Sequence, residues 1–201
     1  MRVLIIGATG AIGSLVADTL ESRDHEVIRA SRHSEVTVDL GDPDSVRSLF
    51  EQVGSVDAVV VAFGPTPYKP VTELDRDDFT AAFNSKALGQ LGVAIEALKH
   101  VNDGGSITLT SGVTARTPIA TCAAAAFVNG GLESFMITAA AEAPRSIRVN
   151  AVSPDVLERS PQFYSSFTGH RPVSDEEVGR AYVLAVEGIV NGQIIKVGDQ
   201  Y

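Results

Sequence analysis

Short apolar runs alternate along the chain with longer segments whose apolar residues recur at helical spacing. Strands are expected at the apolar runs 2–6, 26–30, 35–38, 57–62, 106–110, 147–152 and 193–197. Helices are expected at 11–22, 43–53, 75–100, 118–143 and 174–187. Because parallel strands need a long crossover, usually a helix, this order predicts parallel pairing through right-handed connections. The sequence therefore predicts a single α/β domain over residues 1–201, doubly wound, with about seven parallel strands in one sheet and helices on both faces.

Three segments carry signals for the limits of helices. Asp42 followed by Pro43 is typical of a helix start, because proline suits the first helical position. Ser174 with Glu177 three residues later has the spacing of a capping box. The segment 102–105, Asn-Asp-Gly-Gly, is expected to end the long helix before it.

Charge and composition narrow the partners and the compartment. The formal net charge of −9 opposes the phosphate attraction behind nucleic-acid binding, so no nucleic-acid partner is expected. Cys122 is the only cysteine and cannot form an intrachain disulfide, which suits a reducing compartment, the cytoplasm. The chain has no run of about 18 apolar residues and no visible export signal, so no membrane span is expected. No metal site is predicted, because a chain of this length with 44% hydrophobic residues can build a core without one.

The turn after the first predicted strand reads Gly-Ala-Thr-Gly-Ala-Ile-Gly over residues 7–13. In a Rossmann fold, the first glycine of such a turn permits a tight bend, the second lets the backbone approach a pyrophosphate, and the third lets helix and strand pack closely. The phosphates lie at the helix N-terminus, where free N–H groups and the helix dipole favour negative charge. A purely structural turn is the alternative. The residues expected to bind a dinucleotide here are Gly7, Thr9, Gly10, Ala11, Ile12 and Gly13.

The end of the second strand indicates which dinucleotide is preferred. An acidic residue there would bind the ribose 2′-hydroxyl, whereas this chain has Ser31 and Arg32, and a guanidinium pairs well with a 2′-phosphate. The sequence therefore predicts NADP(H), with NADPH bound at least about tenfold more tightly than NADH. A solvated loop arginine is the alternative. Asp39 either accepts from the adenine amino group or is a turn residue, and Ala62 and Gly64 end the fourth strand, where backbone is expected to pass close to the cofactor.

These features together resemble the short-chain dehydrogenase/reductase family over nearly the whole chain. The matching segments, in family order, are the glycine fingerprint at 7–13, the Asn-Ala-Gly element at 62–64, the active-site asparagine at Asn84, the catalytic-serine strand at 105–112, the Ile-Arg-Val-Asn-Ala-x-x-Pro-Gly segment at 147–154 and the terminal strand at 192–197. The resemblance implies a Rossmann fold and hydride transfer with a nicotinamide cofactor. It also implies catalytic roles for Ser111 and Asn84.

The resemblance breaks at the Tyr-x-x-x-Lys pair, which in that family supplies the acid and binds the nicotinamide ribose. Alignment of the helix after Ser111 places Ala125 at the tyrosine position and Asn129 at the lysine position. Asn129 is expected to serve the ribose through its amide. Lys86 lies two positions from Asn84 and is expected to point to another side of that helix, not to replace the lysine. The loss matters because a positioned acid contributes about 10² to 10⁴ in rate.

Three functions remain open. The first is an NADP(H)-dependent oxidoreductase whose small acceptor, such as a flavin or quinone, needs little acid help. The second is a carbonyl or alcohol oxidoreductase that uses Tyr68 or Tyr164 as its acid. The third is a non-catalytic NADP(H)-binding protein. The small apolar residues of the helix 118–143 also predict association into a homodimer or homotetramer, and the small-molecule substrate is left open.

Overall fold

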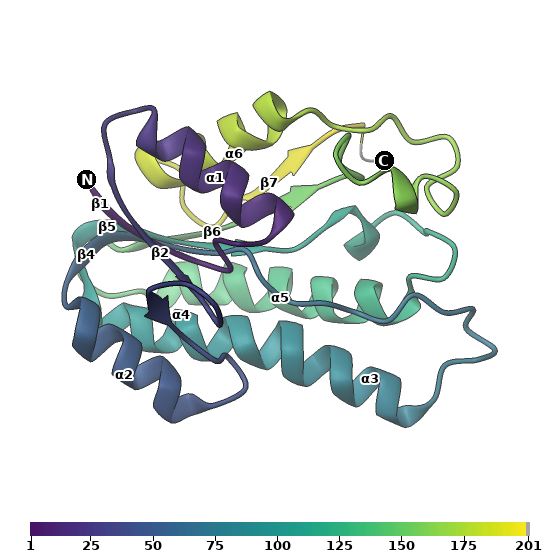
Figure 1. Cartoon of the computed structure of the whole chain (residues 1–201), viewed down its shortest axis with the longest axis horizontal. Helices are drawn as coiled ribbons and strands as arrows, with labels where there is room; N and C mark the ends of the chain where they lie inside the picture. The colour runs from purple at the N-terminus through teal and green to yellow at the C-terminus, as the bar shows by residue number, and fades with distance from the viewer. Residues whose placement is uncertain (200–201) are drawn as a thin grey trace.

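Parallel strands form one sheet through the centre of the molecule (Figure 1). The computed structural model describes residues 1–199, and within them seven strands pair in the order β3-β2-β1-β4-β5-β6-β7. Each neighbouring pair is parallel, which confirms the doubly wound α/β prediction. The strands are β1 (Arg2–Ile6), β2 (Glu26–Ser31), β3 (Val36–Thr37), β4 (Val56–Val61), β5 (Val101–Thr110), β6 (Arg148–Pro154) and β7 (Ile194–Val197).

Helices cover both faces of this sheet, and a cluster of buried hydrophobic side chains fills the space on each side. α1 and α6 pack on one face, and α2, α4 and α5 pack on the other. Over residues 1–199, no helix has the length and apolar character needed to cross a membrane. The helices are α1 (Ala11–Glu21), α2 (Pro43–Val53), α3 (Arg76–Ala82), the π-helical turn η1 (Phe83–Leu88), α4 (Gly89–His100), the 3-10 turn η2 (Val113–Ala115), α5 (Ala123–Glu142), the 3-10 turn η3 (Pro161–Phe163) and α6 (Asp175–Glu187).

The order of the strands places the glycine-rich turn at the binding edge of the sheet. β1 lies between β2 and β4. The chain adds β2 and β3 on one side of β1 and then crosses back to add β4 on the other side, so the direction of winding reverses at β1. Open α/β sheets bind ligands in the crevice outside the carboxyl ends of the strands at such a switch point. Gly7 directly follows β1, and Ala62 directly follows β4.

Three elements differ from the prediction, whereas the other limits agree within about two residues. β5 begins at Val101 because the segment 102–105 lies in a shift of register between β4 and β5 and does not form a turn after the helix. α5 begins at Ala123, not at residue 118, and Thr121 just before it has a φ of 65°, which a right-handed helix cannot contain. The long helix 75–100 is interrupted by η1.

The two predicted helix starts are confirmed. Ser174 Oγ accepts a hydrogen bond from the backbone of Glu177 at 3.2 Å, and Glu177 Oε2 accepts one from the backbone of Ser174 at 2.8 Å. Asp42 accepts from the backbone of Asp44 at 2.9 Å, and Pro43 occupies the first turn of α2.

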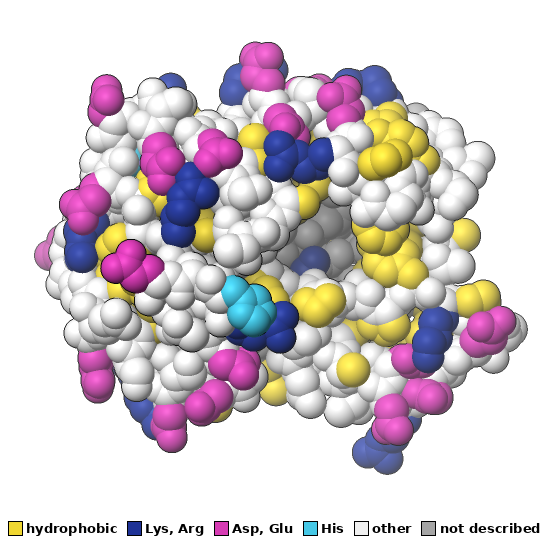
Figure 2. Space-filling view, viewed as in Figure 1, with side chains coloured by type: hydrophobic (Ala, Val, Ile, Leu, Met, Phe, Trp, Pro, Cys, Tyr) yellow, Lys and Arg dark blue, Asp and Glu magenta, His cyan; other side chains and the backbone are white. Residues whose placement is uncertain are grey.

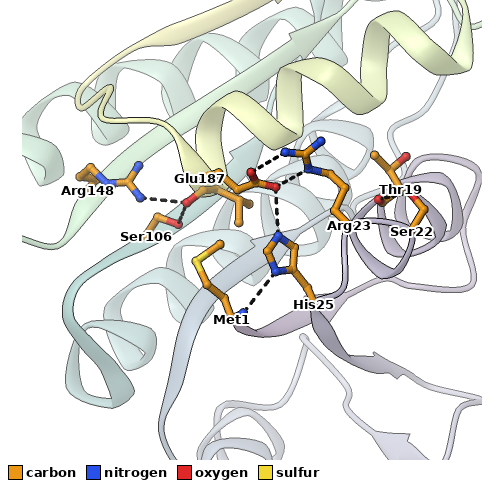
Figure 3. Close-up of polar contacts among 9 residues, drawn as sticks. Met1, Thr19, Ser22, Arg23, His25, Ser106, Arg148 and Glu187 are labelled. Carbon is orange, nitrogen blue, oxygen red and sulfur yellow. Dashed lines mark hydrogen bonds and ion pairs between the residues drawn. The ribbon is translucent and has the colours of Figure 1, made fainter.

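An ion-pair network joins elements at the amino ends of the strands (Figure 3). Glu187, the last residue of α6, accepts hydrogen bonds from the guanidinium of Arg23 at 2.5 and 2.7 Å, and its carboxylate lies 3.0 Å from His25 Nε2. His25 Nδ1 lies 3.2 Å from the α-amino group of Met1. The hydrogen bonds from Arg23, more than any other contact, lower the pKa of Glu187 to about 2. The network ties α6 to the turn between α1 and β2, at the opposite edge of the sheet from Gly7.

Candidate active site

The turn after β1 is shaped by close backbone contacts. Gly7 has a φ of 83°, and a Cβ there would lie 2.5 Å from the carbonyl oxygen of Ala62. A Cβ at Gly13 would lie 2.1 Å from the carbonyl oxygen of Gly7, so a larger residue cannot fit without displacing the turn. Gly10 is the N-cap residue of α1, with an extended backbone and no side chain to cap the helix. The first amide groups of α1 are therefore open to a negatively charged group.

A cavity of about 320 Å³ lies beside this turn. The guanidinium carbon of Arg32 is 6.0 Å from the centre of the Phe63 ring, so a cation and an aromatic face meet at its wall. Ser31 is buried, and its Oγ accepts from the backbone of His33 at 3.1 Å. The structure brings together here seven of the predicted cofactor residues: Gly7, Thr9, Gly10, Ser31, Arg32, Ala62 and Gly64.

Asp39 lies between Val38 and Leu40, which both line this cavity. Its Oδ1 accepts from the backbone of Gly41 at 2.9 Å, and its own backbone N–H donates to Ser45 Oγ at 3.0 Å. Both bonds shape the turn that leads into α2. Asp39 is thus a turn residue at the border of the cavity, and its contact with adenine stays a prediction.

A second cavity, of about 370 Å³, adjoins the first at Gly64, which lines both. Ile12 of α1 and Leu157, which follows β6, are part of its largely apolar wall. A smaller cavity of about 230 Å³ shares Ile12 and Gly64 with it and is also lined by Ala11. Figure 2 shows a face of the molecule that is hollowed near its middle, with hydrophobic side chains along the border of the hollow. The polar side chains of the 370 Å³ cavity include Tyr68, Lys86, Ser111, Asn129 and Asp155.

Lys86, on the π-helical turn η1, lies beside Ser111 in this second cavity. Its Nζ donates to the backbone carbonyl of Ser111 at 3.4 Å. Burial lowers the pKa of Lys86 from its ordinary 10.5 to about 8. Gly64 makes room for the lysine, because a Cβ at Gly64 would lie 2.4 Å from Lys86 Cγ. The site thus holds an ammonium group whose pKa is close to neutral pH.

Asn84, predicted as the catalytic asparagine, does not face Ser111. It is exposed and lines a different groove of about 420 Å³, together with Pro43 and Arg47 of α2. The expectation that Asn84 and Lys86 point to different sides is confirmed, but Lys86 is the one that faces the cavity. A family motif names a helix position, whereas the direction of each side chain depends on how η1 is wound.

The structure, not the sequence, shows that Lys86 faces inward. Ala82 and Gln90, four residues before and after it, are fully buried, and Lys86 itself lines the cavity. Gln90 was also missed. Its Nε2 donates to the carbonyls of Phe63 and Thr110, each at 2.9 Å, and its Oε1 accepts from the backbone of Thr110 at 2.9 Å. Gln90 thereby fixes the spacing of the chain after β4 and the end of β5, next to the cavity.

Ser111 directly follows β5 and is 3% exposed. Its Oγ donates to Glu133 Oε1 on α5 at 2.5 Å. Arg116 forms an ion pair with the other oxygen of Glu133 and donates to Ser153 Oγ on β6 at 2.6 Å. Sequence reasoning missed Glu133 and Arg116, because only the folded arrangement brings these elements together.

The positions aligned with the missing tyrosine and lysine both lie on α5 and line the second cavity. Ala125 is buried and offers no polar group. Asn129 is 3% exposed, and its Nδ2 donates to Thr114 Oγ1 at 2.8 Å. Its Oδ1 is buried and has no hydrogen-bond partner within residues 1–199. A buried acceptor without a partner is costly and suits a ligand hydroxyl, as a ribose would supply.

The two tyrosines proposed as substitute acids differ in position. Tyr68 lines the second cavity and stacks on Phe163 with ring centres 5.0 Å apart. Burial raises the pKa of Tyr68, which makes it a poorer acid. Tyr164 instead donates its hydroxyl to the carbonyl of Glu158 at 2.8 Å and stands apart from the cavity wall. Lys86 is therefore better placed to donate a proton than either tyrosine.

A parallel sheet with a glycine turn at its switch point and two adjoining cavities at its carboxyl edge defines the class of dinucleotide-binding α/β proteins. The family model described as Enoyl-(Acyl carrier protein) reductase matches residues 7–197. The chain belongs to the short-chain dehydrogenase/reductase family, as the resemblance of its sequence implied.

Known proteins show the same relationship. Versicolorin reductase stcU of Emericella nidulans is 28% identical over an alignment of 180 residues that covers 77% of this chain and 68% of that protein. The Hydroxynaphthalene reductase-like protein Arp2 of Metarhizium brunneum is 32% identical over an alignment of 130 residues that covers 62% of this chain and 49% of that protein. Among solved structures, the protein lin1944 from Listeria innocua is 42% identical with a TM-score of 0.95, over 98% of this chain and 99% of that one. A small-chain dehydrogenase in complex with NADPH is 28% identical with a TM-score of 0.89, over 98% and 96% of the two chains.

Proposed function

We propose that this chain is an NADP(H)-dependent oxidoreductase that reduces a small carbonyl compound, with Lys86 as the proton donor. The observation that carries the proposal is the place of Lys86 beside Ser111, in an apolar cavity that adjoins the glycine-rich turn. The proposal differs from an acceptor that needs little acid help, such as a flavin or quinone, which stays an alternative. A substrate of modest size is favoured because about 370 Å³ is near the lower end for ligand pockets.

Three features of the described residues fit NADP(H). The glycine turn leaves the α1 amides open for a pyrophosphate, Arg32 supplies a cation beside the first cavity for a 2′-phosphate, and Asn129 Oδ1 offers the nicotinamide ribose an unpartnered acceptor. When bound, the reduced nicotinamide supplies the hydride. The relative that is in complex with NADPH supports this choice of nucleotide.

In the proposed reaction Lys86 binds the carbonyl oxygen through its ammonium group. As the carbonyl carbon gains hydride, the C=O π bond breaks and the oxygen becomes an alkoxide. A Lys86 N–H bond then breaks and an O–H bond forms, which leaves a neutral amine that takes a proton from water. A donor whose pKa is about 8 remains charged at pH 7 yet releases its proton more easily than an ordinary lysine.

The proposal also includes association into a homodimer or homotetramer. Large hydrophobic side chains are exposed on the outer side of α5, where Phe127 is 56% and Ile137 is 52% exposed. Phe83 of η1 packs against Phe127 with ring centres 6.3 Å apart and is itself 40% exposed. Contiguous exposed apolar surface favours a protein partner, and a second copy of this chain is the simplest one.

The test is a titration of the purified protein with NADPH, followed by NADPH consumption measured against a panel of small ketones and aldehydes. Binding with steady consumption that depends on the carbonyl compound is the expected result. NADPH binding without turnover across the panel would favour the non-catalytic alternative. A titration that gives no heat with NADPH would overturn both.

A further inference from the structure

The hydroxyl hydrogen of Ser111 is donated in a hydrogen bond to the side chain of Glu133. A serine hydroxyl carries one hydrogen and two acceptor lone pairs. The Ser111 hydrogen is donated to Glu133 Oε1 at 2.5 Å, the length of a charge-assisted bond to a carboxylate. A serine so bonded has only lone pairs left for a ligand, although it lines the cavity beside Lys86.

Glu133 is held in the direction that accepts this hydrogen. Its second oxygen pairs with the guanidinium of Arg116, which carries donors only. Glu133 is 6% exposed, and Arg116 is fixed on its other side by Ser153 on β6. Turning the carboxylate away would break both the hydrogen bond from Ser111 and the ion pair with Arg116, which is costly at a buried carboxylate.

We propose that Glu133 is a positioning residue that makes Ser111 a hydrogen-bond acceptor, so that the site selects carbonyl compounds with a hydroxyl group on the carbon next to the carbonyl. The carbonyl oxygen of such an α-hydroxy ketone accepts from the Lys86 ammonium, and its hydroxyl donates to Ser111 Oγ. A simple ketone satisfies Lys86 but leaves the Ser111 lone pairs unpaired in a mostly apolar cavity. This inference rests on the proposed carbonyl reduction and adds a substrate class to it.

The sharpest comparison uses two ketones of which the second has a methyl group in place of the donor hydrogen. 1-Hydroxybutan-2-one and 1-methoxybutan-2-one both place an electron-withdrawing oxygen next to the carbonyl, but only the first carries an O–H. The wild-type protein with NADPH is expected to show a kcat/KM about 10- to 100-fold higher for the hydroxy ketone, the range expected for one hydrogen bond in a desolvated site.

Glu133→Gln should remove this preference and identify its origin. Because Arg116 has only donors to offer, the glutamine amide must turn its oxygen toward Arg116 and its NH2 group toward Ser111. Ser111 then accepts from the glutamine and points its own hydrogen into the cavity. The ratio of kcat/KM for the hydroxy and methoxy ketones is expected to fall to about one or below, with NADPH consumption retained. A merely structural effect would lower both values together and leave the ratio unchanged.

Glu142→Gln is the matched control, because Glu142 is exposed at the end of the same helix. Its ratio should equal that of the wild type. Ser111→Ala gives a second test that does not depend on the folding of the Glu133 variant, and it too should bring the ratio to about one. A wild-type ratio near one, with both ketones reduced, would overturn this inference and leave the proposed function standing. A ratio that survives in both Ser111→Ala and Glu133→Gln would overturn it as well, whereas failure of the wild type to reduce any ketone would remove the proposed function and this inference together.

Discussion

Replacing Lys86 with methionine separates the chemistry of this residue from its cost to the fold. Methionine keeps an unbranched apolar stem of similar length, so it suits the space beside Gly64 and removes only the ammonium. Loss of a positioned acid should lower kcat for carbonyl reduction by about 10² to 10⁴, which is about 3 to 5 kcal/mol of transition-state stabilisation. The affinity for NADPH should change little, because the phosphate contacts proposed above are with the glycine turn and Arg32.

The same substitution should stabilise the protein near neutral pH. A pKa lowered from 10.5 to about 8 means that burying the charged Lys86 lowers the free energy of unfolding by about 3 kcal/mol. This cost is fully present below pH 8, because both the folded and the unfolded chain are then protonated. It disappears as the pH rises from about 8 to about 10.5, where the folded chain has lost the proton first. The methionine variant should therefore gain up to about 3 kcal/mol of unfolding free energy at pH 7 and little at pH 10.5.

The change in stability can be measured by urea unfolding at pH 7 and pH 10.5. The change in catalysis can be measured from the pH dependence of kcat. In the wild type, kcat for reduction should fall as the pH rises through about 8, because the donor loses its proton. Lys86→Arg is the control for charge alone, since arginine stays positive but does not release its proton at these pH values. Wild-type activity in Lys86→Met, or in Lys86→Arg above pH 8, would refute the assignment of Lys86 as the donor.

Three further substitutions test other parts of the structure. Gly13→Ala should abolish NADPH binding and lower the melting temperature, because its Cβ would lie 2.1 Å from the carbonyl of Gly7; unchanged calorimetric titrations would contradict this. Arg32→Ala should weaken NADPH binding by at least about tenfold and leave NADH binding unchanged, and equal losses for both nucleotides would exclude a 2′-phosphate contact. Glu187→Gln should cost at most about 1 kcal/mol at pH 7, because the ion pair is partly exposed. Since the pKa of Glu187 is lowered to about 2, this loss should be constant above about pH 4.5 and shrink as the pH falls toward 2; a loss that grows in acid would contradict the ion-pair explanation.

The fold could be predicted almost completely from the sequence because its signals are local. Each strand is a short apolar run, each helix has its own period, and the turn at Gly7 needs only neighbouring residues to define its shape. The errors fall where a local signal is overruled by tertiary contacts. Asn102 is an example, because it lies in a polar stretch typical of a turn but is held beside β4 by a hydrogen bond to Asp57 Oδ1 at 2.7 Å.

The residues that line the cavity beside the glycine turn could be predicted for the same reason, whereas the contacts around Ser111 could not. The motif places Ser111 after β5, and the structure agrees. The direction of Lys86 depends on the winding of one helical turn, and the contact between Glu133 and Arg116 joins α5 to a loop 17 residues earlier in the chain. Such contacts arise from tertiary packing, so a single sequence shows which residue types are present but not which of them are in contact.

The wide turn η1 makes the number of residues in this stretch as important as their identity. A π-helical turn closes hydrogen bonds five residues apart, one more than an α-helix, so it holds an extra residue between α3 and α4. Removing one residue within it would rewind the segment into a continuous α-helix, in which α3 and α4 keep their inward faces but the side chains of the turn itself change direction. The lysine would then leave the cavity. Insertions and deletions should therefore be excluded from this turn even though it lies partly at the surface, whereas conservative replacements of its outward side chains should be tolerated.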